Sequence, residues 1–502
     1  MLHLKIRPPQ DADVLVVGAG PAGASAALHL ARGGLDVVLL EQQPSPPEST
    51  CCDFVGPVAL VELKRLGVTD QPAFQQTNAI YGASVYLDGK ELLNTLFPDH
   101  PGLPGHGRVI PRDQLDAWIL DAARTAGVQA HKGWQVTGYT CDGDGVTVHA
   151  EQDGQPRSWR ARVLVGADGS SSVIARQLRG RPPSRQDSII AACTHYERVS
   201  GPADQVDLFS SSDTFPGCYW LFPTGDQGAT IGIRMLCETP VPEREHLPRL
   251  LEQLCEQDPA LNERLTGARR VGHVSDWSLT NYGTSARLVD DGVLLVGDAT
   301  GLTLPMNGEG IQFALLSGRW AAGAILEAAA QDDFSRASLQ EYAERVRCEL
   351  RYDMALADLV TQMLRNHSLN PMWMQVLRVI LTRARVDPTY ASVAGGILAG
   401  VEPASSVLQP RLLGGTAKQA IMAAGIGTAK HVLRGPRHLA QVGMQAGNTG
   451  VAWLAETARQ PRRTARWGAG VVLGAAGLAS QIVLHLADAS DPGRSDTMQS
   501  RL

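Results

Sequence analysis

Residues 14–23 are VLVVGAGPAG, a short run of β-branched and aliphatic residues that leads directly into a glycine-rich turn. Residues 24–32 are mostly small, apolar and helix-forming, and the apolar run at 37–40 ends in Glu41. The order strand, glycine turn, helix, strand and acid, with the acid 23 positions after Gly18, is typical of a dinucleotide-binding βαβ unit. The sequence therefore predicts a Rossmann-type domain that binds a dinucleotide.

Each glycine of this turn has its own physical task. Gly18 makes the tight turn, Gly20 lets backbone amides approach a pyrophosphate, and Gly23 lets the helix pack closely on the strand. Phosphates are favoured at the helix N-terminus by its N–H groups and dipole, and Glu41 can accept hydrogen bonds from ribose hydroxyls. The residues predicted to bind the dinucleotide here are Gly18, Gly20, Ala22, Gly23, Glu41 and Gln42.

Two later segments indicate which dinucleotide is bound. Residues 163–169 (VLVGADG) are an apolar run that ends in Asp-Gly, and residues 293–299 (VLLVGDA) repeat the pattern. Taken singly, each predicts only one more buried strand that ends in a turn. In this order and spacing after the glycine turn, they resemble the FAD-binding pattern of the flavoprotein monooxygenase and reductase superfamily.

This resemblance implies FAD as the cofactor and gives roles to individual residues. Asp298 stands where the superfamily contacts the ribityl and phosphate region, and the helix start at 308–311 stands where it faces the flavin ring. Asp168 and Gly169 match the middle motif. Arg112, in the segment PRDQL, matches an arginine that contacts the cofactor, and a solvated surface arginine is the alternative. The positions assigned in this way are Arg112, Asp168, Gly169, Gly297, Asp298, Pro305, Gly308, Glu309, Gly310 and Ile311.

Within the superfamily, the sequence is similar to the geranylgeranyl reductase group rather than to aromatic hydroxylases. Residues 297–302 are GDATGL, and Thr300 stands where hydroxylases commonly carry histidine. Residues 51–60, CCDFVGPVAL, resemble that group's motif CGDGLTPRA, with Cys52 in place of glycine and Val58 in place of arginine.

A third segment carries the same resemblance. Residues 218–223, CYWLFP, resemble the group's motif YxWxFP on the sheet that roofs the substrate cavity, with Cys218 in place of the tyrosine. The matches lie between about residues 12 and 322, roughly the first two thirds of the chain. They imply a lipophilic small-molecule substrate.

Three residues are predicted to serve the chemistry. Reduction of an isolated C=C bond needs hydride from reduced flavin and a proton for the other carbon, in an apolar pocket without water. Trp220 and Phe222 suit the wall of that pocket, because alternate residues of a strand share a face, although a plain sheet core also explains them. Cys51 is predicted to be a catalytic thiol, with a buried structural cysteine as the alternative. Asp53 is assigned to a loop, with a proton relay as the alternative.

These observations predict an FAD-dependent oxidoreductase that reduces C=C bonds of an isoprenoid or other lipophilic substrate. The alternatives are an FAD-dependent monooxygenase that hydroxylates or epoxidises an apolar secondary metabolite, and a flavin-carrying membrane scaffold without activity. No second nucleotide-binding motif is present in the sequence, so we expect NAD(P)H or a ferredoxin-like donor as the external reductant.

The composition narrows the class of protein further. Glycine and proline make up about a sixth of the 502 residues, too few for a low-complexity chain. The eight cysteines show no metal-ligand or disulfide-framework spacing, so no metal site is predicted. The net charge of −6 argues against a nucleic-acid coat. That charge is uneven, because residues 403–466 carry +8 and residues 1–402 carry −13.

The C-terminal hundred residues suggest attachment to a membrane. Residues 467–484 are largely apolar and follow Arg462, Arg463 and Arg466, which would attract anionic lipid. A buried glycine-rich helix, an interfacial or re-entrant anchor and a true span are the three alternatives. The expected location is cytoplasmic, on the cytoplasmic face of a membrane, and the oligomeric state is left open.

The predicted fold class is α/β, with an inserted antiparallel-sheet domain. Residues 1–80, 105–185 and 285–330 are assigned to the FAD-binding domain, and residues 81–104 and 186–284 to the substrate-binding sheet domain. A helical region follows at 331–400, then a basic Gly/Ala-rich helical region at 401–487 as the membrane attachment, and a disordered tail at 488–502.

Overall fold

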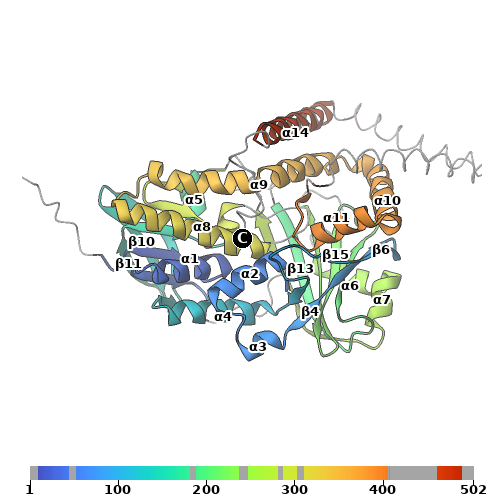
Figure 1. The fold of residues 1–502 in the computed structure, drawn as a ribbon, viewed down its shortest axis with the longest axis horizontal. Coiled ribbons are helices and arrows are strands. Elements are labelled where there is room, and N and C mark those ends of the chain that lie inside the picture. Colours follow the sequence, from blue (N-terminus) through green and yellow to red (C-terminus); the bar gives the residue numbers. More distant parts are fainter. Residues whose placement is uncertain are drawn as a thin grey trace, which may run out of the picture.

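The computed structural model describes residues 10–44, 53–180, 188–236, 247–280, 286–301, 310–404, 406, 459 and 461–488. An α/β part lies at one end of the molecule and a largely antiparallel sheet at the other, and one long helix, α9 (Arg336–Leu364), runs across both (Figure 1). The expected α/β fold class with an antiparallel-sheet part is confirmed.

The α/β part is built on a six-stranded sheet. Its strands in spatial order are β18 (Val289–Asp290), β19 (Val293–Leu295), β12 (Val163–Gly166), β1 (Val14–Val17), β2 (Val37–Glu41) and β8 (Gln129–Lys132). All neighbours are parallel except β18 and β19. The strands of the three sequence motifs therefore lie side by side, and their carboxyl ends meet at one edge.

Both faces of this sheet are buried, which explains why its strands are continuous apolar runs. Val14, Val16 and Leu39 pack against helices, whereas Leu15 and Leu40 pack against a second, smaller sheet. The helices on the first face are α1 (Pro21–Arg32), α2 (Pro57–Leu66), α4 (Arg112–Thr125), α8 (Gly310–Gln331) and α9 (Arg336–Leu364). The smaller sheet is β9 (Gln135–Asp142), β10 (Gly145–Gln152) and β11 (Gln155–Ala161), with α5 (Val173–Arg179) beside it.

The second large sheet has seven strands. In spatial order they are β17 (Arg269–Thr280), β13 (Ser188–Glu197), β16 (Gly228–Leu236), β15 (Cys218–Gly225), β14 (Gln205–Ser210), β5 (Gly82–Leu87) and β6 (Lys90–Leu96). The neighbours are antiparallel except β14 and β5, which are parallel, so the sheet is largely antiparallel. One face is covered by α6 (Leu247–Gln257) and α7 (Pro259–Leu265). Alternate residues of β15 such as Tyr219 and Leu221 point to this face and are buried under the two helices. The other face carries Trp220 and Phe222 toward the α/β part.

Short elements join the two large sheets. A three-stranded sheet of β3 (Phe54–Val55), β7 (Gly107–Val109) and β4 (Asn78–Ile80) lies between them, and α3 (Pro72–Gln75) precedes β4. The antiparallel pairing of β3 with β7 brings residue 54 to the start of α4, because β7 leads into that helix.

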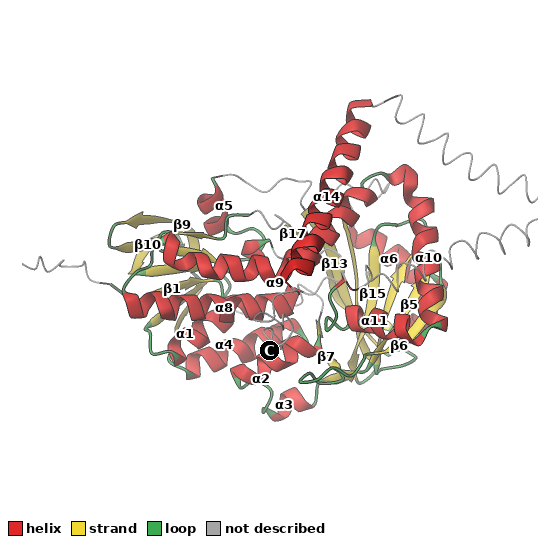
Figure 2. Cartoon of the chain, turned by 45° about the horizontal axis from the view of Figure 1, so that its top comes forward, coloured by secondary structure: helices red, strands yellow, loops and turns green. Residues whose placement is uncertain are grey.

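The C-terminal helices lie on the outside of this frame (Figure 2). Tyr342, Val346, Leu350 and Met354 of α9 are buried, as their four-residue spacing predicts. The chain continues through η4 (His367–Leu369), α10 (Asn370–Val386) and α11 (Pro388–Leu398), which pack on β6, and through α14 (Pro461–Asp488), which packs on α9.

The long C-terminal helix α14 is packed through one face only. The Trp467 indole donates to the Gln362 carbonyl oxygen at 2.8 Å, and Leu478 is buried in a cluster with Leu359. A Cβ at Gly474 would lie 3.4 Å from the Leu359 side chain, so the small residues allow close approach to α9. Among the described helices, none has the length and apolar character that crossing a bilayer needs.

Candidate active site

The glycine turn after β1 has the conformation that its sequence predicts. Gly18 has a φ of +104°, and a Cβ there would lie 2.2 Å from the Ala167 carbonyl oxygen. A Cβ at Gly23 would lie 2.0 Å from the Gly18 carbonyl oxygen, whereas one at Gly20 would meet nothing within 4 Å. Gly18 and Gly23 thus permit close packing, and Gly20 faces open space.

Glu41 at the end of β2 ties the second strand to this turn. The Ala19 N–H donates to Glu41 Oε2 and the Gln43 N–H donates to Oε1, both at 2.8 Å. Each carboxylate oxygen has room for a further donor, because the two oxygens together offer about four acceptor sites. Gln42 is exposed beside it. Glu41 is therefore held at the mouth of the turn with acceptor capacity to spare.

The second and third motifs reach the same edge of the sheet by different means. The Asp168 carboxylate turns to the start of α5, where it accepts from the Ser172 hydroxyl at 2.5 Å and from the Val173 N–H at 2.7 Å. The next residue, Gly169, lines the cavity with a φ of +73°. Asp168 therefore shapes the turn, and Gly169 is the residue of that pair that a ligand would meet.

The third motif enters the cavity through a short helical turn. Gly297 begins η3 (Gly297–Thr300) with a φ of +58°, and a Cβ there would lie 2.6 Å from that of Ala22. Asp298, Gly310 and Ile311 follow as lining residues. Cys51, Pro305, Gly308 and Glu309 lie outside the described residues.

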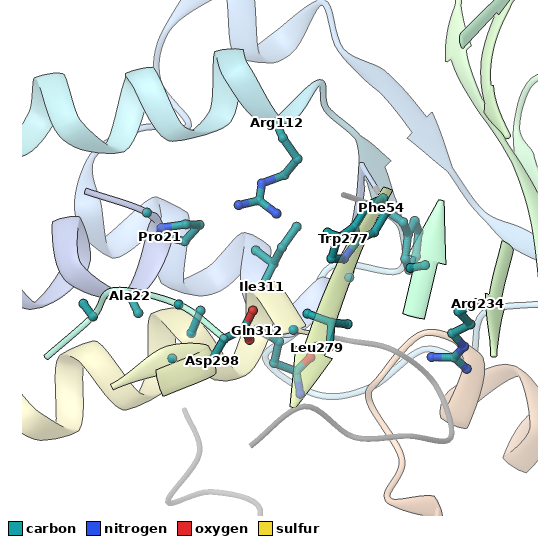
Figure 3. A pocket seen from close by; sticks show the side chains of 18 of the residues that line it. Pro21, Ala22, Phe54, Arg112, Arg234, Trp277, Leu279, Asp298, Ile311 and Gln312 are labelled. Carbon is teal, nitrogen blue, oxygen red and sulfur yellow. The ribbon is translucent and has the colours of Figure 1, made fainter. Parts of the chain in front are cut away.

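Arg112 projects from the start of α4 into the same space. Its guanidinium makes a two-pronged ion pair with Asp116, with Nε–Oδ1 at 3.2 Å and Nη2–Oδ2 at 3.1 Å. Burial raises the pKa of Asp116, and the neighbouring Arg112 charge opposes that rise. The pair holds the arginine side chain in one orientation, directed into the cavity (Figure 3).

One cavity brings these residues together with the antiparallel sheet (Figure 3). The cofactor-motif side is formed by Gly20, Pro21, Ala22, Arg112, Ala167, Gly169, Gly297, Asp298, Gly310, Ile311, Gln312 and Ala314. The facing side is formed by Phe54, Gly56, Ala191, Trp220, Phe222, Arg234, Trp277 and Leu279. Apart from Arg234, the side that faces the cofactor motifs is thus aromatic and aliphatic.

The aromatic wall has a defined packing. Trp220 and Phe222 are 3% and 7% exposed, and their rings lie 5.8 Å apart at 23°. The Phe54 ring lies 5.9 Å from that of Phe222. A Cβ at Gly232 would lie 2.3 Å from the Trp220 ring, so that glycine makes room for the indole. Trp220 and Phe222 belong to a buried cluster of the sheet and also line the cavity.

The polar atoms of the cavity fit a flavin nucleotide. The first turn of α1 has no side-chain cap and no acidic residue, so its N–H groups suit a pyrophosphate. Gln312 is 3% exposed and its Oε1 has no hydrogen-bond partner among the described residues. A buried carbonyl oxygen that faces a cavity needs a donor from a ligand, and the flavin ring carries an N–H group. The residues present therefore fit FAD.

Asp53 lies in a loop, as expected, directly before β3, and its side chain is buried. It is 1% exposed, and its Oδ2 accepts the Thr230 hydroxyl of β16. Thr230 Oγ1 in turn lies 3.1 Å from His195 Nδ1. Burial raises the pKa of Asp53 to about 7, and the Thr230 hydrogen bond and the Arg112 charge oppose that rise. Burial also lowers the pKa of His195.

Several lining residues were not identified from the sequence. Phe54 and Gly56 stand inside the quoted segment CCDFVGPVAL, and Gln312 directly follows a cofactor motif, so position alone could have indicated them. Trp277 and Leu279 alternate on β17, which is the signal of a shared face. Arg234, Ala191 and the close approach of Trp220 to Gly232 depend on strand pairing that the sequence does not specify.

Comparison with known proteins agrees with this geometry. A family model described as an FAD binding domain matches residues 11–348. Digeranylgeranylglycerophospholipid reductase 2 of Methanopyrus kandleri is 31% identical over 339 residues, 66% of this chain and 81% of that protein. The chain belongs to the geranylgeranyl reductase-like family of FAD-dependent oxidoreductases. A menaquinone reductase of Mycolicibacterium smegmatis is also 31% identical to this flavoprotein, over 66% of its chain and 81% of the relative.

Solved structures show that the fold of this flavoprotein is widely shared. A geranylgeranyl bacteriochlorophyll reductase-like protein of Thermoplasma acidophilum matches with a TM-score of 0.66 and 23% identity, over 79% of this chain and 97% of the other. A flavin-dependent brominase matches with a TM-score of 0.64 and 19% identity, over 84% of this chain and 99% of the other. These likenesses concern the fold, and the chemistry has to be argued from the cavity.

Proposed function

We propose that this oxidoreductase reduces C=C bonds of an isoprenoid or comparably lipophilic polyene held between the cofactor motifs and the aromatic wall. The observation that carries the proposal is the apolar side of the cavity, formed by Phe54, Trp220, Phe222, Trp277 and Leu279 opposite the cofactor motifs. An isolated double bond offers no polar group for an enzyme to polarise. Its recognition must therefore come from apolar contact and the exclusion of water.

The cofactor would be held by the residues that the motifs predict and that meet at the cavity. Gly20 and the first turn of α1 would bind the pyrophosphate, Glu41 the ribose, Asp298 the ribityl region, and the start of α8 the ring. Bound and reduced, FAD supplies a hydride. We also propose that Arg112, Gly169 and Gln42 contact the cofactor. The same is proposed for the predicted cofactor-binding positions that lie outside the described residues.

The chain's own task is to position the substrate and keep the site dry. Trp220 is fixed by Gly232 beneath it and Phe222 is stacked beside it, so the two rings form a rigid wall. A rigid apolar wall holds a flexible polyene against the cofactor side without hydrogen bonds. Arg112, fixed by Asp116, provides positive charge on the cofactor side of the same space.

The relatives support a lipophilic substrate. Two of them are named as reductases of a digeranylgeranylglycerophospholipid and of menaquinone. Both molecules carry isoprenoid chains and reside in membranes, so a substrate of that solubility agrees with the apolar wall. NAD(P)H or a ferredoxin-like protein is proposed as the electron donor.

Action at a membrane surface is part of this proposal, and α14 supports it. Arg462, Arg466, Leu473 and Ala476 are exposed and follow the spacing of one helix face, turned away from the face that packs on α9. Val472 and Leu473 are 68% and 72% exposed. Arginine and apolar side chains together on an exposed face suit an interface with anionic lipid.

The decisive experiment reduces the holoenzyme anaerobically with dithionite and adds a digeranylgeranyl phospholipid in detergent micelles. We expect mass spectrometry to show a gain of two hydrogen atoms for each double bond reduced. A Trp220→Ala variant that retains FAD should lose at least tenfold in rate, because the wall no longer holds the polyene. A product that forms only in air and contains added oxygen would instead establish a monooxygenase.

A further inference from the structure

A chain of three hydrogen-bonded side chains lies on the cavity-facing side of the seven-stranded sheet and ends behind the wall of the cavity. His195 of β13 is half-buried, Thr230 of β16 is fully buried, and Asp53 lies just before β3. His195 and Thr230 are paired directly across the two strands. The sheet itself therefore holds the histidine ring beside the threonine hydroxyl.

Asp53 lies directly behind the cavity wall. The next residue, Phe54, lines the cavity. Thr230, which donates to Asp53 Oδ2, is paired across β15 and β16 with Phe222, another lining residue. Asp53 Oδ1 is buried and has no hydrogen-bond partner among the described residues. One oxygen of the carboxyl group thus belongs to the chain, while the other is available for a partner that enters with substrate or water.

The hydroxyl of Thr230 has a single proton, so it can donate to only one of its two neighbours, Asp53 and His195, at a time. This determines how a proton can pass along the three side chains. When Asp53 is a carboxylate, Thr230 donates to it and His195 Nδ1 must donate to Thr230. When Asp53 is protonated, the order can reverse, with Asp53 donating to Thr230 and Thr230 to His195. The two orders differ by the passage of one proton along the chain.

We propose that Asp53, Thr230 and His195 form a proton relay that supplies the second hydrogen of the reduction, an inference that rests on the proposed function. A solvent proton enters at His195 Nε2, the Nδ1 proton passes to Thr230, and the Thr230 proton passes to Asp53 Oδ2. The double bond receives a hydride with both electrons from the reduced flavin at one carbon. The protonated carboxyl group of Asp53 turns to bring this proton from the Thr230 side to Oδ1, and the other carbon receives it there.

The charges that face the relay agree with this task. Arg112 and Asp113 at the start of α4 face Asp53, and Asp113 also faces His195. Across the sheet, the residue paired with His195 on β17 is Val271, which does not titrate. The Arg112 charge favours the carboxylate of Asp53, and burial together with Asp113 favours the acid. Asp53 can therefore be protonated and deprotonated near neutral pH, as a proton donor in turnover requires.

The sheet also offers a matched control residue. Thr194 is the neighbour of His195 on β13, is 1% exposed, and has no hydrogen-bond partner for its hydroxyl among the described residues. Thr230→Val and Thr194→Val each remove one buried hydroxyl from the same sheet. Only Thr230→Val breaks the relay, and Thr230→Ser restores the hydroxyl.

The first test measures anaerobic reduction of the digeranylgeranyl phospholipid by dithionite-reduced holoenzyme between pH 5 and 9. We expect Thr230→Val to lower the rate at neutral pH by about a hundredfold, the lower end of what general acid catalysis contributes. Thr230→Ser and Thr194→Val should stay within about threefold of wild type. The wild-type rate should fall above about pH 7, and the rate of Asp53→Asn should be low and without that fall.

The second test needs no turnover. Infrared difference spectra of the holoenzyme, with Asp53→Asn as reference, follow the protonated carboxyl of Asp53 as pH rises. Its midpoint should shift upward in Thr230→Val, because the hydrogen bond that favours the carboxylate is gone, and should stay unchanged in Thr194→Val. Flavin content and melting temperature verify that each variant is folded.

The outcomes separate this inference from the proposed function. Failure of the wild type to reduce any polyprenyl lipid refutes the proposed function and, with it, the relay. Reduction by wild type and by Thr230→Val at equal rates, with equal carboxyl midpoints, refutes the relay alone. Equal loss in Thr230→Val and Thr194→Val means that the hydroxyl serves only packing, which also refutes it.

Discussion

At the scale of single residues, the unusual feature is a carboxyl group buried in an apolar neighbourhood. Asp53 lies among the aromatic residues of the cavity wall, with Phe54 following it and Phe222 paired with its partner Thr230. Burial penalises the charged form of a carboxyl group, so the proton is held to higher pH in the folded protein than in the unfolded chain. This links the stability of the fold to the protonation of one residue.

The sign of that link gives a prediction. The pKa of Asp53 is about 7 in the folded state, against an ordinary value of 3.8 in the unfolded chain, so the folded state binds more protons between these pH values. Stability must therefore fall as pH rises from about 4 to about 7, by at most about 1.4 kcal/mol per pH unit. Asp53→Asn removes this contribution. Urea titrations at pH 4.5 and 7.5 measure the free energy of unfolding of the variant and of the wild type. Relative to wild type, the variant should be more stable at pH 7.5 than at pH 4.5. A constant difference would contradict the burial argument.

At the scale of elements, the β1–turn–α1 unit assigns opposite tasks to glycines that look alike in the sequence. Gly23 has no side chain because the Gly18 carbonyl oxygen occupies that space. At Gly20, by contrast, no atom of the protein occupies the place that a Cβ would take. Its extended backbone, with φ −64° and ψ 177°, is also one that alanine adopts. Packing thus requires Gly23, and only a ligand requires Gly20.

Alanine substitutions should separate these two tasks. Gly23→Ala should destabilise the protein by about 3 kcal/mol or more, because the new methyl group overlaps backbone that cannot move freely. Gly20→Ala should melt at the wild-type temperature without FAD and bind FAD at least tenfold more weakly. Thermal denaturation of the apoprotein and fluorescence titration with FAD measure the two effects. A Gly20→Ala apoprotein that is unstable would mean that the turn itself needs this glycine.

At the scale of the whole molecule, the cavity lies where two independently built sheets meet. The parallel sheet supplies the ends of β1, β12 and β19, and the second sheet supplies apolar residues of β13, β15 and β17 together with Arg234 of β16. The helix α9 spans this arrangement, and α14 adds an exposed basic and apolar face on the outside (Figure 2). Under the proposed function, this exposed face contacts the membrane that supplies the lipophilic substrate.

The exposed face of α14 carries a prediction of its own. Leu473→Asp should weaken binding to vesicles with anionic lipid about tenfold, because it removes an apolar contact and adds repulsion. Its melting temperature should not change, since Leu473 is 72% exposed. Val386 at the end of α10 is 65% exposed, and Val386→Asp is the matched control. Vesicle co-sedimentation compares the two. Equal weakening by both would show that α14 is not the contact.

The sequence by itself determined the local features of this protein. The glycine turn, the apolar strands of the parallel sheet, the period of α9 and the alternation of Trp220 with Phe222 each follow from residues close together in the chain. Local sterics and burial on one or both faces fix such patterns wherever the segment lies. The cofactor and the fold class could therefore be predicted.

Only the tertiary structure decided which distant residues share a space. It placed Trp277, Leu279 and Arg234 opposite the cofactor motifs, turned the carboxylate of Asp168 to the start of α5, and buried Asp53 beside Thr230 and His195. These contacts depend on strand register and on how two sheets pack, which are set by the sum of many weak long-range interactions. No short stretch of sequence encodes that sum, so the relay became visible only when residues 53, 195 and 230 were brought together.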